Sequence, residues 1–223
     1  MNIAAMLADP ATTGPVLLTV KVLAASGFFF LVLGIPLAYF LSRRSGILWD
    51  AVNIAATLPL VFPPIAVGFV LLLLLGREGP FGPLVQDTVV FAFPGLIIAA
   101  FVSGLPLMLR PIQAALQEPE VARLAELSAT LGKSEWETAI RVLFPVVRRS
   151  VAAGLLLALC RAMGEVGVTL MLGGNIIGKT NTLSLEIYNA VFFGEFERAM
   201  VLSAIVGAAA TGIFIMLKRW SAL

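Results

Sequence analysis

The sequence predicts an all-α membrane protein with five transmembrane helices. Of the 223 residues, 60% are hydrophobic and only 13% are charged, and the mean hydropathy is +1.01. Burial stabilises apolar surface only where something covers it, and a water-soluble domain of this size needs much less of it. The apolar residues also gather in five runs, each close to the roughly 20 residues that cross about 30 Å of hydrocarbon. Lipid is therefore the expected cover.

The five expected spans follow the chain at residues 15–41, 55–76, 89–109, 150–172 and 199–217. Pro36 is expected to kink the first of them. The second contains Pro59, Pro63 and Pro64, and a proline in a helix interior costs about 3 kcal/mol unless neighbouring groups satisfy the freed carbonyls. We therefore expect a kinked packing helix there, and a bend that shapes a pathway is the alternative.

The lysines and arginines outside the spans set the orientation. With the N-terminus outside, ten of them fall in inside segments: Arg43, Arg44, Arg110, Arg123, Lys133, Arg141, Arg148, Arg149, Lys218 and Arg219. Only three fall outside: Arg77, Lys179 and Arg198. This bias predicts an outer N-terminal tail (residues 1–13), a transmembrane domain (residues 14–217) and a cytoplasmic tail (residues 218–223). No basic stretch, short apolar stretch and cleavage site precede the first span in the order of a signal peptide, so no removable signal peptide is expected. Residues 180–193, in an outer loop, are expected to form a re-entrant or interfacial helix.

One long polar segment, residues 118–149, lies between the third and fourth spans. Apolar or small residues recur in it at the spacing of two amphipathic helices: Val121, Leu124, Ala125, Ser128 and Leu131, then Trp136, Ala139, Ile140 and Leu143. Gly132 is expected to end the first helix in the left-handed conformation. Ser134 and Glu137 form a capping box for the second helix, which is expected to end before Pro145. From spacing alone, a polar loop that packs on its own protein is an equally good interpretation.

Residues 173–180 (GGNIIGKT) match the phosphate-binding pattern G-x-x-x-x-G-K-T. That loop requires a strand before it and a helix after it in a soluble α/β domain. Here a predicted span precedes it, and the topology places it outside, where ATP is absent. We interpret it as a turn with an exposed lysine.

Arg161 and Glu165 lie near the middle of the fourth expected span, where a charge costs at least about 2.5–3.5 kcal/mol. Because they are four residues apart, they share a helix face and can pair. Two interpretations stay open: a neutralised pair that fixes helix packing, or a charged patch that faces an aqueous pathway or a partner subunit. In both, the pair points away from lipid.

The groups of residues that catalysis or metal binding would need are not apparent in the sequence. The chain has no histidine, and its one cysteine, Cys160, lies in an apolar run, so neither a metal site nor an internal disulfide is expected. No nucleophile–base pair is apparent, and no basic stripe interleaved with aromatic residues suggests nucleic-acid binding. We therefore expect neither an enzyme nor a cofactor bound by this chain.

The polar segment resembles the cytoplasmic EAA loop of type I ABC importer permeases. Their pattern is E-A-A, three residues, G, nine residues and I-x-L-P. Glu126, Gly132 and Pro145 fall on it, whereas Leu127 and Ser128 replace the alanines and Val142 and Phe144 replace isoleucine and leucine. Three further segments resemble molybdate importer permeases: LPLVFPP at 58–64 with Gly68, RAMGEVG at 161–167 and GNIIGKT at 174–180. The resemblance spans residues 14–217.

This resemblance implies a MetI-like fold in the cell's inner membrane and a homodimer that forms the pathway. It also implies two ABC ATPase subunits, which bind ATP and Mg²⁺, and a periplasmic or lipid-anchored oxyanion-binding protein. Residues 118–145 would dock on the ATPase through these coupling residues: Glu126, Leu131, Gly132, Trp136 and Pro145. Tungstate and sulfate or thiosulfate importers share much of the pattern and stay open. An ion-coupled secondary transporter, which would show inverted repeats around a midplane site, and a non-transporting scaffold are alternatives of another class.

Overall fold

A computed structural model describes residues 9–222, and all the regular structure within that range is helical. Four helices are long and apolar enough to cross a membrane: Pro10–Arg43, Phe93–Leu116, Glu135–Met163 and Phe196–Arg219. Two shorter apolar helices, Ile47–Leu60 and Pro64–Leu75, stand in place of the second expected span. Of the expected tails, residues 1–8 and 223 lie outside the described range, residues 10–13 begin the first helix and residues 218–222 end the last one.

The first span is one continuous helix made of α2 (Pro10–Phe29), a π-helical turn (Phe30–Gly34) and α3 (Ile35–Arg43). Asp9 caps its start by accepting a hydrogen bond from the N–H of Ala11 at 2.9 Å. The irregularity expected at Pro36 takes the form of the π turn directly before it, in which the N–H of Ile35 bonds to the carbonyl of Phe30. The wider turn accommodates a proline that has no N–H to give.

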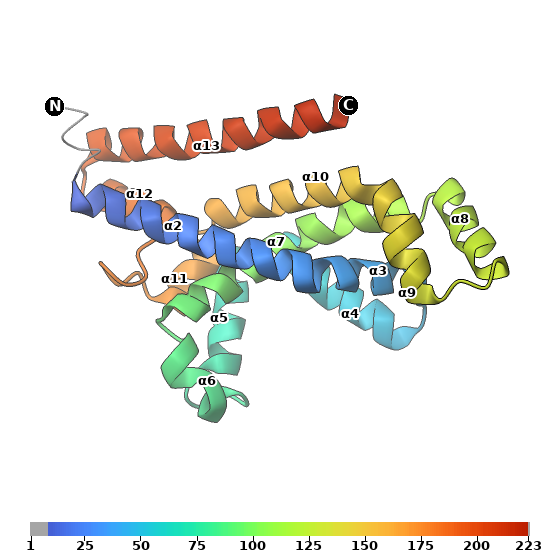
Figure 1. The fold of residues 1–223 in the computed structure, drawn as a ribbon. Coiled ribbons are helices and arrows are strands. Elements are labelled where there is room, and N and C mark those ends of the chain that lie inside the picture. Colours follow the sequence, from blue (N-terminus) through green and yellow to red (C-terminus); the bar gives the residue numbers. More distant parts are fainter. Residues whose placement is uncertain (1–8, 223) are drawn as a thin grey trace.

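The second expected span is wrong as a single helix. It consists of α4 (Ile47–Thr57), a 3₁₀ turn (Leu58–Leu60) and α5 (Pro64–Leu75), with residues 61–63 as an open break. Pro63 has an extended backbone (φ −55°, ψ 129°), which a following proline favours, and Pro64 starts the next helix. The prolines therefore break the helix rather than bend it. Together α5 and α6 (Gly82–Val89) project from the side of the long helices (Figure 1).

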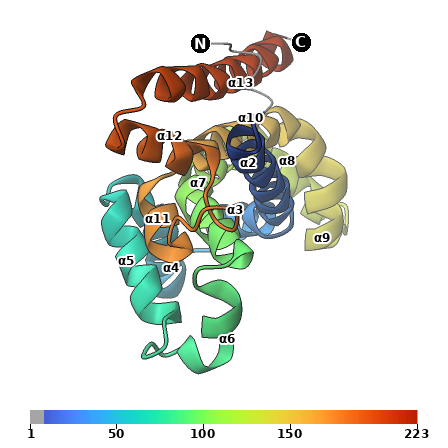
Figure 2. The same ribbon diagram turned by 90° about the vertical axis from the view of Figure 1, so that its left-hand side faces the viewer.

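The third span, α7 (Phe93–Leu116), is the centre of the molecule and contacts α2, α3, α10 and α11 (Figure 2). Its contact with α10 depends on two glycines. A Cβ added to Gly154 would lie 2.8 Å from the carbonyl oxygen of Met108, and one on Gly104 would lie 2.8 Å from that of Ala158. The backbones of α7 and α10 therefore approach closely, as small residues allow in membranes.

The fourth span begins earlier and ends earlier than expected. A single helix runs through α9 (Glu135–Thr138), a second π turn (Ala139–Leu143) and α10 (Phe144–Met163). The expectation that this helix ends before Pro145 is wrong, because the N–H of Phe144 bonds to the carbonyl of Ala139 in a π turn that accommodates the proline as at Pro36. After a break, α11 (Gly167–Gly173) follows as a separate short helix.

The C-terminal part consists of α12 (Leu183–Phe192), which is the helix expected within residues 180–193, and α13 (Phe196–Ala222). α13 lies outermost and crosses the other long helices obliquely (Figures 1 and 2). Only 6% of its apolar stretch is buried inside the chain, against 61% for that of α7. α13 therefore offers its surface to lipid or to another chain.

Candidate functional site

The polar segment forms a two-helix element at one end of the bundle: α8 (Pro119–Thr130), a turn and α9 (Figure 1). Gly132 has a φ of +75°, and the N–H of Lys133 bonds back to the carbonyl of Ser128 at 3.1 Å, which is the pattern of a left-handed helix stop. Ser134 Oγ accepts a hydrogen bond from the N–H of Glu137 at 3.2 Å. The expected hinge and cap are both confirmed.

Glu137 does not complete the capping box. Its Oε1 instead accepts hydrogen bonds from Lys133 Nζ at 3.2 Å and Arg141 Nη1 at 2.9 Å. The Lys133 ammonium, helped by the Arg141 guanidinium, lowers the pKa of this carboxyl, which lies ahead of the apolar stretch of its helix. Because Lys133 is in the turn and Arg141 is in the π turn, Glu137 joins the hinge to the start of the long helix.

The inner face of the two-helix element is part of the main core of the protein. Val121 and Ala125 of α8 and Leu143 of the π turn are buried in one cluster with residues of α3 and α7, including Tyr39 and Ile112. A displacement of the two-helix element would therefore pull on three long helices. Ser128 and Ala139, also expected on the apolar faces, are buried with them.

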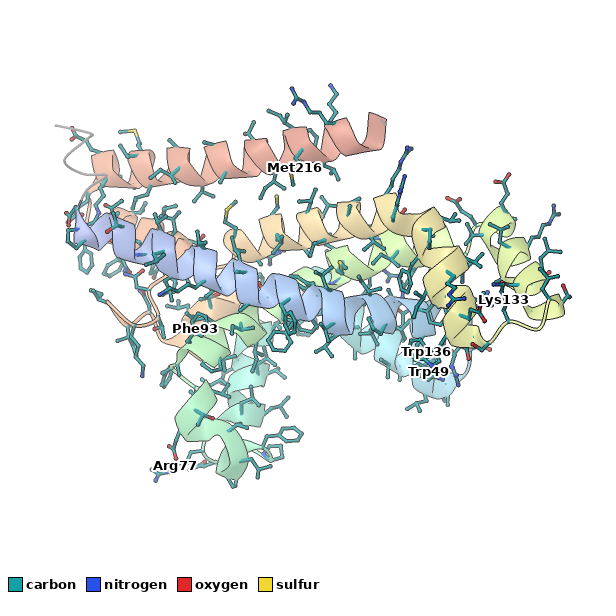
Figure 3. All side chains as sticks on the ribbon, viewed as in Figure 1. Trp49, Arg77, Phe93, Lys133, Trp136 and Met216 are labelled. Atoms are coloured by element: carbon teal, nitrogen blue, oxygen red, sulfur yellow. The ribbon has the colours of Figure 1, made fainter. Side chains whose placement is uncertain are left out.

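The outer face of the same element leaves large apolar side chains open. Leu131 is 78% exposed and Trp136 60% exposed, and Leu124, Leu127 and Ile140 are also exposed. Trp136 and Trp49 both pack on the ring of Phe40, at 6.1 and 6.2 Å between centroids, near the α3 end of the bundle (Figure 3). The core of the protein thus covers only part of the expected apolar faces, and the rest of each face is exposed.

Four of the five expected coupling residues lie on the hinge or on this open surface. Glu126 is exposed on α8, and its side chain makes no hydrogen bond or ion pair within residues 9–222. A Cβ on Gly132 would have no atom within 4 Å, and Leu131 and Trp136 flank it in sequence. Pro145 lies apart from them in the first turn of α10, where it is exposed.

Arg161 and Glu165 do pair, but not within one helix as expected. α10 ends at Met163, and Glu165 lies in the break before α11. The carboxylate is 2% exposed, and its Oε1 accepts a hydrogen bond from the N–H of Val168 at 2.8 Å, so it caps α11 while it pairs with Arg161. The arginine side chain is 30% exposed. The carboxylate thus stabilises the interruption of the helix.

The two interrupted helices meet at their breaks. A Cβ on Gly167 would lie 2.9 Å from Pro64 Cβ and from the backbone nitrogen of Ile65. One on Gly68 would lie 2.8 Å from Val168 Cα. The start of α5, created by Pro63 and Pro64, is therefore held against the start of α11.

Two hydroxyl groups that the sequence did not single out also stabilise this region. Ser184 Oγ donates to the carbonyl of Met163 at 2.6 Å, which satisfies an orphan group at the end of α10. Thr19 Oγ1 accepts from the N–H of Leu183 at 2.8 Å and so joins α2 to α12. Their only signal in the sequence is a hydroxyl in or beside an apolar run.

The GGNIIGKT segment is a closed turn. The hydroxyl of the fully buried Thr180 donates to the carbonyl of Gly173 at 2.7 Å and accepts from the N–H of Ile176 at 2.9 Å. The N–H groups of residues 179–181 all bond to the carbonyl of Ile176. A helix precedes the turn instead of a strand, and four N–H groups of the segment are already bonded within the chain, those of Gly174, Ile176, Lys179 and Thr180. The interpretation as a turn with an exposed lysine, Lys179, is confirmed.

No group of three or more histidine, cysteine, aspartate or glutamate side chains within the described range is placed to hold a metal ion.

Comparison with known proteins gives a consistent set of relatives. Residues 31–219 match the family model described as "Binding-protein-dependent transport system inner membrane component". The "Molybdenum transport system permease protein ModB" of Azotobacter vinelandii is 36% identical over 186 residues, 82% of each chain. ModB of Escherichia coli K12 is 32% identical over 221 residues, 97% of this chain and 96% of its own. The chloroplastic "Sulfate permease 2" of Chlamydomonas reinhardtii is 35% identical over 158 residues, 70% of this chain and 42% of its own.

Proposed function

The chain belongs to the family of inner membrane components of binding-protein-dependent transport systems, and on that premise we propose that it is the membrane-spanning subunit of an ATP-driven molybdate importer. The observation that carries the substrate is the likeness to a molybdenum permease along 97% of this chain and 96% of that one. The sulfate permease matches a smaller share of both chains, so sulfate is the second candidate. The protein is a multi-pass protein of the inner membrane.

The working complex in this proposal contains two copies of the chain, which form the pathway through isologous contacts. Two ATPase subunits bind ATP and Mg²⁺ on the cytoplasmic side, and an oxyanion-binding protein delivers the cargo on the other side. The chain itself contributes no catalytic group. The sparsely buried surface of α13 leaves room for such neighbours.

For the topology we propose five crossings, with the N-terminus outside and the C-terminus in the cytoplasm. The second crossing is then the interrupted pair α4 and α5 rather than one straight helix. Arg43 and Arg44 precede this pair and Arg77 follows it, and the ten-to-three distribution of basic residues supports the orientation. Non-helical backbone at membrane depth is tolerated where protein or a water-filled cavity surrounds it, as for the break that packs on α11.

The two-helix element is our candidate for coupling to the ATPase. Its buried inner face joins it to α3, α7 and the helix that contains α10, so that a push on α8 moves the bundle. Its open side chains, among them Leu131 and Trp136, supply the kind of apolar anchors that dominate binding at protein interfaces. Glu126 supplies an unpaired charge on the same helix, and Gly132 provides the turn.

The Arg161–Glu165 pair has a positioning role in this proposal. Glu165 caps α11 where that helix packs on the start of α5, and Arg161 pairs with the buried carboxylate. Because the arginine is 30% exposed, its guanidinium is also the group that an oxyanion in a pathway along the two breaks would meet.

Uptake by the reconstituted complex tests the function. Proteoliposomes with this chain, its ATPase and its binding protein should accumulate molybdate when ATP is enclosed with the ATPase. Sulfate should be carried much more poorly at the same concentration. Uptake that needs an ion gradient and no ATP would refute the importer, and a preference for sulfate or tungstate would refute the substrate.

A further inference from the structure

A cavity of about 520 Å³ lies at the end of the bundle opposite the two-helix element. One wall is a stripe of α2 from Pro10 to Lys21, and the other is the turn at residues 177–179 together with three polar residues: Asn181, Glu186 and Arg198. Most of the α2 wall is apolar, with Leu17 and Leu18 at its middle. The cavity is separate from the coupling surface and from the paired breaks, and the proposed function gives it no role.

Lys21 and Lys179 both line this cavity, and the side chain of neither makes a hydrogen bond or ion pair with any described residue. Lys179 is on the exposed turn. Lys21 is exposed on a helix that spans the membrane, eleven residues after the start of α2. An ammonium group on the apolar surface of a span is costly unless it reaches water or meets an anion.

The only carboxylate in the lining cannot neutralise these lysines. Glu186 pairs with Arg198 and accepts a hydrogen bond from Asn181 Nδ2 at 2.6 Å. Arg198 also donates to the carbonyl of Ala11 at 3.0 Å, which ties the floor of the cavity to the start of α2. Arg198 pairs with Glu195 as well, at 3.3 Å, which leaves Lys21 and Lys179 as the two cations of the lining that no described carboxylate pairs.

A buried acceptor in the same floor has no partner. Asn181 is 3% exposed and lines the cavity, and its Oδ1 receives no hydrogen bond within residues 9–222. The orientation of the amide group is fixed, because its Nδ2 donates a hydrogen bond to Glu186 Oε2. This oxygen has less than 1 Å² of accessible surface, so it belongs to the closed floor of the cavity and is out of reach of a ligand there.

We propose that this cavity binds a tetrahedral oxyanion group, with Lys21 and Lys179 as its charge partners. The chemistry is shared by two sources. One is the phosphate of an anionic phospholipid, for which the apolar α2 wall and the position of Lys21 on a spanning helix are suited. The other is a free oxyanion from the outer solution.

Two binding measurements on the full chain test the proposal and separate the sources. Native mass spectrometry measures retention of phosphatidylglycerol against phosphatidylcholine. Equilibrium dialysis in lipid-free detergent measures binding of inorganic phosphate and of molybdate. The variant is Lys21→Gln combined with Lys179→Gln, two exposed positions whose change leaves the core untouched. We expect its affinity to fall about 30-fold in the arm that corresponds to the true ligand.

Arg77→Gln is the matched control, because Arg77 is an exposed basic residue on the α5–α6 turn, away from this cavity (Figure 3). It should bind as the unchanged chain does. Selective retention of phosphatidylglycerol that the lysine variant loses supports the lipid source, and phosphate or molybdate binding that it loses supports the free oxyanion. Equal binding by the unchanged chain and the lysine variant in both arms overturns the site, as does an equal loss in Arg77→Gln. Neither readout needs ATP or transport, so the outcome is independent of the proposed function.

Discussion

The two ends of the bundle are built on opposite principles. The two-helix element at residues 118–145 is tied to the core by apolar side chains and leaves further apolar side chains open. The turn and helices at residues 173–198 are tied together by polar groups that satisfy one another: Thr180 with Gly173, Asn175 with Asn189, and Glu186 with Arg198. The first end has exposed apolar surface, and the second has lysine side chains, Lys21 and Lys179, without a carboxylate partner among the described residues. The ends should therefore differ in what they bind and in what happens when they are altered.

The largest effect on transport is expected from substitutions at the hinge glycine, Gly132. Gly132→Trp should abolish ATP-driven uptake while membrane insertion stays intact. No atom lies within 4 Å of a Cβ at this position, so the isolated chain has room for the indole and only a docked partner would clash. Gly132→Ala imposes the same left-handed strain, of order 1 kcal/mol, without the bulk, and should retain most of the uptake. Normal uptake by the tryptophan variant would remove the coupling role.

A smaller effect is expected on the open apolar surface. Leu131→Glu should weaken copurification of the ATPase about 30-fold, since it places a charge at an apolar anchor. Leu84→Glu is the control, because Leu84 is equally open on α6 at another part of the molecule. Both variants should insert and melt alike. If the two lose the ATPase to the same extent, the docking surface has been assigned to the wrong place.

The opposite end should respond through stability. Thr180→Val removes a fully buried hydroxyl that makes two hydrogen bonds, and leaves the carbonyl of Gly173 and the N–H of Ile176 without it. We expect a loss of about 1–3 kcal/mol and a melting temperature lower by several degrees, with the ATPase still bound. Thr130→Val removes an exposed hydroxyl bonded only within its own helix and should change little. A Thr180→Val chain that melts normally would contradict the closed turn.

Much of the first end could be read from the sequence, because its determinants are local. The glycine stop, the serine cap and the helical spacing of Val121 and Ala125 all lie within a few residues of what they control. The split of the apolar faces into buried and open halves could not be read, since it depends on how much of each helix α3 and α7 cover. Leu131 and Val121 are both aliphatic, yet Val121 is buried in the core cluster with α3 and α7, whereas Leu131 is exposed.

The two breaks show the limit of reasoning from apolar runs. Residues 55–76 and 150–172 look like continuous spans because hydropathy does not register backbone conformation. Pro63 and Pro64 are a local signal in the sequence, from which a bend is predicted, whereas the structure has a complete break. Around Glu165 the signal is tertiary: the break exists where Gly167 lies against Pro64, and the carboxylate then caps α11. Paired interruptions of this kind could be predicted only from contacts between distant segments.

The smallest effect is expected from Glu137, the most connected charge of the first end. Glu137→Gln removes the pairing with Lys133 and Arg141 but keeps the shape and leaves Ser134 as the cap. The side chains involved are partly or largely open to water, where salt and solvent screen such pairs and their net contribution is small. The melting temperature and uptake of the complex should stay close to those of the unchanged chain, in low salt and in high salt alike. A large loss of uptake without a loss of stability would mean that Glu137 contacts the ATPase directly. The polar groups of this end would then belong to the docking surface along with Leu131 and Trp136.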